Sequence, residues 1–296
     1  MDVTLDQLRT LAAVVDEGTF DGASVALRVT PSAISQRIKA LESACGRVLV
    51  TRTKPVQPTP PGVAMLRLAR TTTRLAQDTA REIGVDTRAG YATLPIAVNA
   101  DSLATWFLSA LARLPARHLA VFDVHVDDQD RTFDLFHSES VLAAVTSVAR
   151  PMPGCTVTTL GSMRYFACAA PDFVDAWFPE GLTHDAMAEA PLVVFNRKDT
   201  LQHRFIGEVS GAALAPPTHY LPASADFVRG IQLGLGWGLV PHLQWAALAD
   251  PASLVHLAPD HPVDVPLYWQ AWTLDSPPLR ALTAAVQAAA GALRTP

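Results

Sequence analysis

Side chains that can hydrogen-bond to base edges and phosphates lie along one face of the segment 28–42. Thr30 can cap a helix that has Pro31 at its first position, where a missing N–H costs nothing. Apolar residues recur at helical spacing and leave hydroxyl, amide and cationic groups outward, at Ser32, Ser35, Gln36 and Lys39. Such a face suits the major groove of DNA, although an ordinary amphipathic surface helix would also explain it.

Two shorter predicted helices precede this segment. Apolar residues at helical spacing predict a first helix over 5–15, which Gly18 ends, and Thr19 can cap a second helix over 20–27. Three short helices, of which the third is polar outside and basic at its end, predict a helix-turn-helix.

A basic wing is predicted after the third helix. A short strand over 48–54 carries Arg52 and Lys54 at its far end, where they can reach phosphates or the minor groove. Between positions 28 and 58 there are six lysines and arginines and a single acid, Glu42. The residues expected to contact DNA are Thr30, Pro31, Ser32, Ser35, Gln36, Arg37 and Lys39 from the helix, and Arg52 and Lys54 from the wing.

A second set of residues suits a zwitterionic ligand. Ser102 and the N–H groups of a helix beginning at Leu103 form a site for a carboxylate, and Ser224 precedes a second helix start. Asp101 and acids that follow a predicted strand can pair with ammonium groups, although Asp101 equally suits the first turn of its own helix and the loop acids suit solvent. The expected ligand contacts are Ala100, Asp101, Ser102, Asp127, Asp128, Asp130, Thr146, Phe195, Ser224 and Phe227.

Alternating strands and helices position this second set. A buried strand is predicted at 94–98, and further strands are predicted at 119–126, 141–145, 164–170, 192–195, 238–241 and 265–273. Helices are predicted over 103–114, around 133–136 and over 279–293, and the last strand and helix return to the first lobe. This order predicts open parallel sheets in two lobes, which bind ligands at the carboxyl ends of their strands.

A long helix is predicted over 59–82, between the two parts of the chain. Leu66 and Ala76 are among the apolar and small residues along its side. That side can pack on its own domain or pair with a second copy, and pairing is favoured because a small DNA-binding head gains affinity by dimerising. A hinge is predicted over 84–90.

The predicted fold class is α+β and multidomain. A winged helix-turn-helix head is expected over 1–58, a linker helix and hinge over 59–90, and a two-lobed α/β domain of the periplasmic-binding-protein type over 91–296. Within the last domain, the first lobe is expected at about 91–162 and 267–296, and the second at about 163–266.

Charge and cysteine content restrict the partners and the compartment. Residues 1–88 have a net charge of +3 and residues 89–296 of −8, which favours a polyanionic partner for the first part. Three cysteines without C-x-x-C spacing predict neither a disulfide scaffold nor a zinc site. There is no apolar run of membrane length and no signal-peptide pattern, so a cytoplasmic protein is expected.

Enzymatic interpretations find little support in the motifs. The glycines at 234, 236 and 238 lack G-x-G-x-x-G spacing and lead into a strand, so a dinucleotide site is rejected. The nine histidines show no metal-ligand spacing, and no G-x-S-x-G elbow occurs. Neither a catalytic site nor a cofactor or metal is therefore expected.

The whole chain resembles LysR-type transcriptional regulators in this order of elements. The segments 30–39, 97–107 and 190–199 resemble the lysine- and arginine-responsive ArgP/LysG subgroup, which also has Ser-Gln-Arg at 35–37 where many LysR-type proteins have Ser-Arg-Gln. Pro31 stands where many relatives carry Gln, which removes one base contact that those relatives can make.

The resemblance implies a homodimer or homotetramer that binds double-stranded promoter DNA and responds to lysine or arginine in the cleft. Its target would be a gene for a basic-amino-acid exporter or a related metabolic gene. Two alternatives stay open. One is a LysR-type regulator of an organic or aromatic acid pathway. The other is a two-lobed solute-binding protein, against which the head and the missing signal peptide argue.

Overall fold

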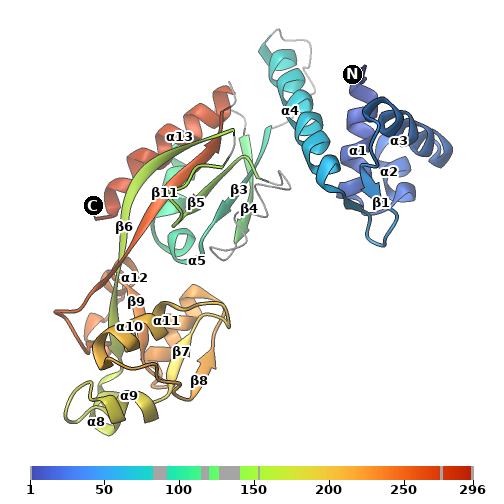
Figure 1. Cartoon of the computed structure of the whole chain (residues 1–296). Helices are drawn as coiled ribbons and strands as arrows, with labels where there is room; N and C mark the ends of the chain where they lie inside the picture. The colour runs from blue at the N-terminus through green and yellow to red at the C-terminus, as the bar shows by residue number, and fades with distance from the viewer. Residues whose placement is uncertain are drawn as a thin grey trace. The chain divides into compact units, whose positions relative to one another are not determined.

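The computed structural model describes residues 2–82, 92–114, 120–126, 141–152, 154–273 and 276–294 (Figure 1). These residues form two compact units. One unit holds the head and the long helix, and the other holds most of the residues from 95 onward. Each unit has hydrophobic residues packed in a core of its own.

Three capped helices form the head, as predicted. They are α1 (Leu5–Asp16), α2 (Phe20–Leu27) and α3 (Pro31–Cys45). Each begins after a threonine whose hydroxyl accepts a hydrogen bond from the backbone N–H three residues later, at Thr4, Thr19 and Thr30. Ile34, Ile38 and Leu41 of α3 are buried in the core, so its polar residues face outward.

The wing is shorter than the sequence predicts. Strands β1 (Val50–Thr51) and β2 (Gln57–Pro58) pair antiparallel, so the strand expected over 48–54 ends at residue 51. The chain then turns back onto the head because Val56 is buried and its N–H donates to the Gly18 carbonyl at 2.8 Å. Arg52 and Lys54 therefore lie in an exposed loop.

The long helix α4 spans Pro60–Glu82, as predicted. The Thr59 hydroxyl accepts a hydrogen bond from the Gly62 N–H at 3.1 Å and donates to the Val48 carbonyl at 2.7 Å, which ties the helix start to the wing. Only glycine fits at position 62, because a Cβ there would lie 1.8 Å from the carbonyl oxygen of Leu49.

The two faces of α4 have different surroundings. Leu66 and Ala69 are 1% and 0% exposed and belong to the core of the head, where α1 packs against α4. The prediction that Leu66 lies on a pairing surface is therefore wrong. Leu68 and Leu75, on the opposite face, are 38% and 43% exposed. The hinge expected over 84–90 lies outside the described residues.

A mixed seven-stranded sheet runs through the second unit. Its order is β10-β6-β11-β5-β3-β4, and β9 also pairs with β6. The strands are β3 (Ala92–Val98), β4 (Ala120–Val126), β5 (Ala143–Thr146), β6 (Cys155–Ala169), β9 (Gly238–Pro241), β10 (Val255–His256) and β11 (Val263–Trp272).

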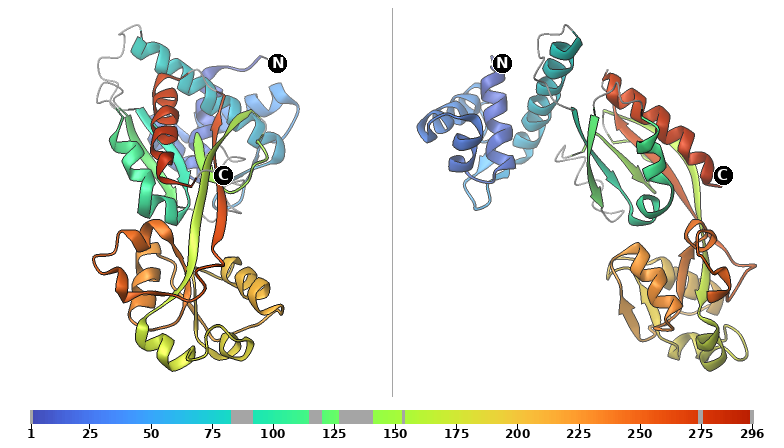
Figure 2. Two further views of the ribbon diagram at one scale, coloured as in Figure 1. Left: turned by 90° about the vertical axis from the view of Figure 1, so that its left-hand side faces the viewer. Right: turned by 180° about the vertical axis from the view of Figure 1, so that it is seen from behind.

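Strands β6 and β11 pair antiparallel and connect the two lobes of this unit (Figure 2). For that reason the prediction of open parallel sheets is wrong for these strands. Parallel pairing does occur between β3 and β5 in the first lobe, and between β7 (Leu192–Val194) and β8 (Thr218–Tyr220) in the second. The register of β6 and β11 shifts between Leu267 and Tyr268, opposite Gly161.

Helices flank the strands in both lobes. Those of the first lobe are α5 (Ala100–Ser102), a π-helical turn (Leu103–Phe107), α6 (Leu108–Ala112) and α13 (Pro277–Ala289). Those of the second are α8 (Pro171–Trp177), α9 (His184–Glu189), α10 (Leu201–Ser210), α11 (Ser224–Gln232) and α12 (His242–Ala246). Short 3-10 turns complete the described elements at Pro251–Ser253 and Ala290–Ala292.

The C-terminal helix returns to the first lobe, as predicted, and the indole of Trp269 donates to Thr283 of α13 at 3.1 Å. The helix expected around 133–136 lies outside the described residues. Among the helices that the structure describes, none is both long and apolar enough to cross a bilayer.

The glycines at 236 and 238 have a packing role. A Cβ at Gly236 would lie 2.6 Å from the Pro191 carbonyl oxygen, and one at Gly238 would lie 3.0 Å from the ring of Phe227. These contacts explain the glycine-rich segment without a nucleotide.

Truncating Leu66 should destabilise the head far more than truncating Leu68. Leu66→Ala leaves a cavity in a packed core, which costs about 2–5 kcal/mol, whereas Leu68→Ala on the exposed face changes stability by about 0.5 kcal/mol or less. Hydrogen exchange of the α1 amides in the full chain measures this difference. Equal α1 protection in the two variants would contradict the assignment of the two faces.

Candidate functional site

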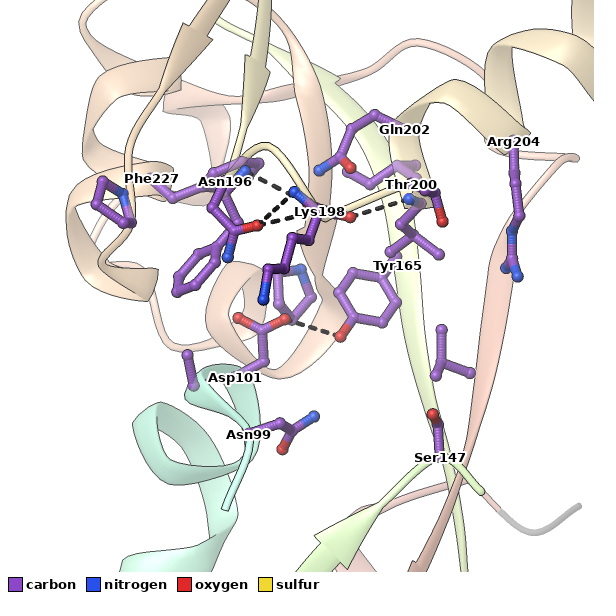
Figure 3. Close-up of a pocket in the computed structure, with 18 of the residues that line it drawn as sticks. Asn99, Asp101, Ser147, Tyr165, Asn196, Lys198, Thr200, Gln202, Arg204 and Phe227 are labelled. Carbon is purple, nitrogen blue, oxygen red and sulfur yellow. Dashed lines mark hydrogen bonds between the residues drawn. The ribbon is translucent and has the colours of Figure 1, made fainter. Parts of the chain in front are cut away.

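A pocket of about 660 Å³ lies between the two lobes of the second unit (Figure 3). The first lobe contributes the start of α5, and the second contributes the turn between β7 and α10. Strands β6 and β11 add Tyr165 and Asp264. The polar and charged residues that line the pocket are Asn99, Asp101, Ser147, Tyr165, Asn196, Lys198, Asp199, Thr200, Gln202, Arg204 and Asp264.

Asp101 connects the two lobes at this pocket. Its Oδ1 accepts a hydrogen bond from Ser224 Oγ at 2.6 Å, and its Oδ2 accepts one from the Tyr165 hydroxyl at 2.8 Å. Gln244 Nε2 donates in turn to Ser224 Oγ at 2.8 Å. One carboxylate of the first lobe is thus held by β6 and α11, with α12 supporting the arrangement.

Burial raises the pKa of the Asp101 carboxyl above its ordinary value, although the hydrogen bonds from Ser224 and Tyr165 act in the opposite direction. Burial also raises the pKa of Tyr165, and the charge of Asp101 adds to that shift. An ionised Asp101 is therefore poorly solvated, and a cation entering the pocket would gain more from it than from an exposed carboxylate.

The helix beside Asp101 begins earlier than the sequence predicts. Asn99 caps it by accepting the Ser102 N–H at 3.2 Å, and the Leu103 N–H donates to the Asn99 carbonyl at 3.1 Å. The expected carboxylate site at Ser102 and Leu103 is therefore wrong, because both N–H groups are used and Ser102 is fully buried away from the pocket lining. The amides of Ala100 and Asp101 are the ones at the helix start.

The other expected ligand contacts have different outcomes. Ala100, Phe195 and Phe227 line the pocket, and Ser224 reaches it only through its bond to Asp101. Thr146 is buried outside the lining, where its hydroxyl accepts the Val148 N–H at 3.2 Å. The remaining contacts, Asp127, Asp128 and Asp130, lie outside the described residues.

Sequence reasoning missed the turn 196–200. Asn196 Oδ1 accepts the N–H groups of Lys198 and Asp199 at 2.8 and 3.2 Å, and Asp199 Oδ1 accepts that of Leu201 at 2.9 Å. The buried Gln202 amide can orient its nitrogen toward Asp199 and donate to both carboxylate oxygens, at 3.0 and 3.2 Å. An Asn and an Asp three residues apart between a strand and a helix indicate such a turn.

Asp264 is neutralised within the protein. It lies opposite Arg164 in the antiparallel register of β11 and β6, and two hydrogen bonds join the side chains, one of them 2.7 Å from Nε to Oδ1. The Arg164 guanidinium lowers the pKa of the Asp264 carboxyl. Within the part of the chain that the structure describes, no cluster of His, Cys, Asp and Glu is arranged to hold a metal ion.

A second candidate site lies on the head. Ser32, Ser35, Gln36 and Lys39 are exposed along one face of α3, and Arg52 and Lys54 are exposed in the wing. Pro31 is exposed at the helix start, whereas the Thr30 hydroxyl is used in the cap. Arg37 is partly buried and its guanidinium lies 3.5 Å from the Asp6 carboxylate, so it also links α3 to α1.

Two family models match the chain. Residues 5–63 match the model for bacterial regulatory helix-turn-helix proteins of the lysR family, and residues 91–291 match the LysR substrate binding domain. The second match alone covers more than half of the chain.

Curated relatives and solved structures match along the full length. The chain is 42% identical to the HTH-type transcriptional regulator LysG of Mycobacterium tuberculosis over 99% of this chain and 96% of that protein. It is 40% identical to the lysine export transcriptional regulatory protein LysG of Corynebacterium glutamicum, over 96% and 97% of the two chains.

The structural matches agree. The crystal structure of ArgP from M. tuberculosis superposes with a TM-score of 0.91 at 41% identity and covers 100% and 99% of the two chains. The structure of full-length LysG from C. glutamicum with bound effector Arg superposes with a TM-score of 0.81 at 37% identity. The match covers 99% of this chain and 100% of that chain.

Asp101→Asn should stabilise the second unit at neutral pH. Because the folded state raises the pKa of Asp101, it binds a proton more readily than the unfolded chain, and the ionised group destabilises the fold above its ordinary pKa. The gain in free energy of unfolding should shrink as pH falls from about 7 to about 4. Tryptophan fluorescence reports this unit, since all six tryptophans lie at or beyond position 106.

The exposed Asp260→Asn is the matched control for this comparison, and it should not reproduce the pH-dependent difference. The argument would be contradicted by an Asp101→Asn variant that is less stable than wild type at neutral pH and whose stability relative to wild type rises as the pH is lowered.

Proposed function

Because this chain belongs to the LysR family of bacterial regulatory helix-turn-helix proteins, we propose that it is a DNA-binding transcriptional regulator whose effector is lysine or arginine. The observation that carries the effector assignment is the buried Asp101 carboxylate, held between two lobes in a pocket of about 660 Å³. We propose that residues 1–58 bind DNA, that residues 59–90 form a pairing helix and a hinge, and that residues 91–296 form the effector domain.

The charges in the pocket support a cationic amino acid. A ligand ammonium or guanidinium gains from pairing with a poorly solvated carboxylate, and Asp101 supplies one. The acids at 127, 128 and 130 are further candidates for the same role. We propose that the ligand carboxylate binds at the start of α5, beside the amides of Ala100 and Asp101.

The rival functions fit this pocket and this chain less well. An organic or aromatic acid has no cationic group to pair with the buried Asp101 carboxylate, so that charge would stay uncompensated. A solute-binding protein has no need of a head with an exposed polar recognition helix and a basic wing. The relatives are named as regulators, which supports a role without catalysis. A regulator that binds DNA works in the cytoplasm.

The relative from C. glutamicum is named for lysine export. We infer that the target here is a gene for an exporter of basic amino acids or a related metabolic gene.

Two substitutions on the head should separate base contacts from backbone contacts. Gln36→Ala should change which DNA sequences are preferred, because an exposed amide on α3 reads base edges. Arg52→Ala should weaken binding to all sequences and reduce the slope of log K against log salt by about 1. Fluorescence anisotropy with selected and random duplexes measures both.

Arg229→Ala, an exposed arginine of the second lobe, is the control for loss of one positive charge. A folded Gln36/Arg52 double variant with unchanged affinity and selectivity would refute the DNA-binding assignment.

The exposed face of α4 supports self-association. Ala64, Leu68, Leu75 and Thr79 recur at helical spacing on the side opposite the head core, and all four are exposed. The apolar members of this stripe, Ala64, Leu68 and Leu75, would be stabilised by pairing with a second copy.

Leu75→Glu should convert the dimer or tetramer to monomers by placing charges at the helix pair. Light scattering gives the mass, and Val25→Glu is the control because Val25 is 78% exposed on α2. A Leu75→Glu chain that keeps the wild-type mass would place the interface elsewhere.

Calorimetry of the full chain tests the effector. Lysine or arginine should bind the wild type, and Asp101→Asn should weaken binding by about 3–5 kcal/mol because the cation loses a buried partner. Asp260→Asn should bind as wild type. Binding of an anionic or aromatic metabolite, with no binding of lysine or arginine at millimolar concentration, would refute the effector assignment but leave the LysR-type regulator intact.

A further inference from the structure

Lys198 is a cation of the pocket that lies opposite Asp101. Its side chain extends from the turn 196–200 into the pocket, on the same side of Tyr165 as Asp101 (Figure 3). Within the described residues, no hydrogen bond or ion pair engages that ammonium group. The group is therefore available to a ligand.

The turn around Lys198 is built to hold this position. Asn196 Oδ1 accepts the backbone N–H of Lys198 at 2.8 Å, and the Asp199 carboxylate accepts the N–H groups of Phe195 and Leu201 at 3.3 and 2.9 Å. These bonds hold the backbone of the turn on both sides of Lys198. Arg197, the next cation along the chain, instead lies over the Tyr220 ring at 4.6 Å.

The other charged residues that line the pocket either have partners within the protein or lie away from Asp101. Asp264 is paired with Arg164, and the Asp199 oxygens accept hydrogen bonds within the turn. Arg204 projects on the other side of Tyr165, away from Asp101 (Figure 3). Lys198 and Asp101 thus present opposite charges to one part of the pocket, as a zwitterion requires.

We propose that Lys198 binds the α-carboxylate of the effector while Asp101 binds its cationic group. This inference rests on the proposed function and adds a second-lobe contact to the α5 amides of the first lobe. Lys198 then distinguishes an amino acid from the amine that lacks its carboxylate. Cadaverine has the two ammonium groups of lysine but no carboxylate. When cadaverine is bound, the Lys198 ammonium therefore has no anionic partner on the ligand.

Calorimetry of the full chain with lysine and with cadaverine tests this assignment. Lys198→Gln should weaken lysine binding at least about tenfold, the usual cost of a lost charge-assisted hydrogen bond, and should leave cadaverine binding unchanged or tighter. The wild type should bind cadaverine at least about tenfold more weakly than lysine. Arg197→Gln removes the same charge one residue away and should leave both affinities within about twofold.

Four outcomes would overturn the assignment. Unchanged lysine binding in Lys198→Gln would show that Lys198 does not contact the ligand. Tighter lysine binding would show that the Lys198 ammonium competes with the ligand cation for Asp101. Equal weakening of lysine binding and cadaverine binding would show that Lys198 stabilises the turn and does not recognise the carboxylate. A wild type that binds neither lysine nor arginine would instead contradict the proposed function, and this inference would fall with it.

Discussion

The burial of one carboxylate is the constraint on which the arrangement of the pocket depends. Asp101 lies at the start of a helix in the first lobe, but its two oxygens accept hydrogen bonds from Tyr165 and Ser224 of the second. A buried carboxylate without such partners would be strongly destabilising. The two donors keep it in place, and the remaining lone pairs can accept hydrogen bonds from a ligand cation.

The crossing strands make this contact between lobes achievable. The long antiparallel pair β6 and β11 connects them, and its register shifts opposite Gly161, next to the residues of β11 that pair with β5. Gly161 has a φ of +133°, and a Cβ there would lie 2.6 Å from the Arg294 carbonyl oxygen, so another residue would be strained. A ligand that contacts both lobes stabilises the relative position of the lobes in which its contacts with both are strongest. Binding in the pocket can thereby affect the rest of the chain.

The sequence predicted the head well because its elements are short and locally encoded. Threonine caps, the first-turn proline and helical spacing all act within a few residues, and the three helices and α4 begin where those residues place them. The sequence did not reveal which face of α4 packs on α1, because Leu66 and Leu68 are equally apolar and only tertiary packing separates them. The length of the wing likewise depends on a contact with Gly18.

The pocket was harder to predict for the same reason. Asp101, Phe195 and Phe227 were identified from their places after strands and at helix starts, and each lines the pocket. Tyr165 and Lys198 were missed because one sits within a long strand and the other in a turn, where local spacing carries no information about the facing lobe. The helix start shifted to Ala100 because Asn99 is the cap.

The titration of Asp101 itself tests the central claim most directly. The carboxyl carbon can be followed by nuclear magnetic resonance in the full chain and assigned by comparison with Asp101→Asn. Without ligand, its midpoint should lie above that of an ordinary aspartate, because burial raises the pKa. With saturating arginine the midpoint should fall, because a bound guanidinium favours the charged form. A midpoint that arginine leaves unchanged would contradict the account.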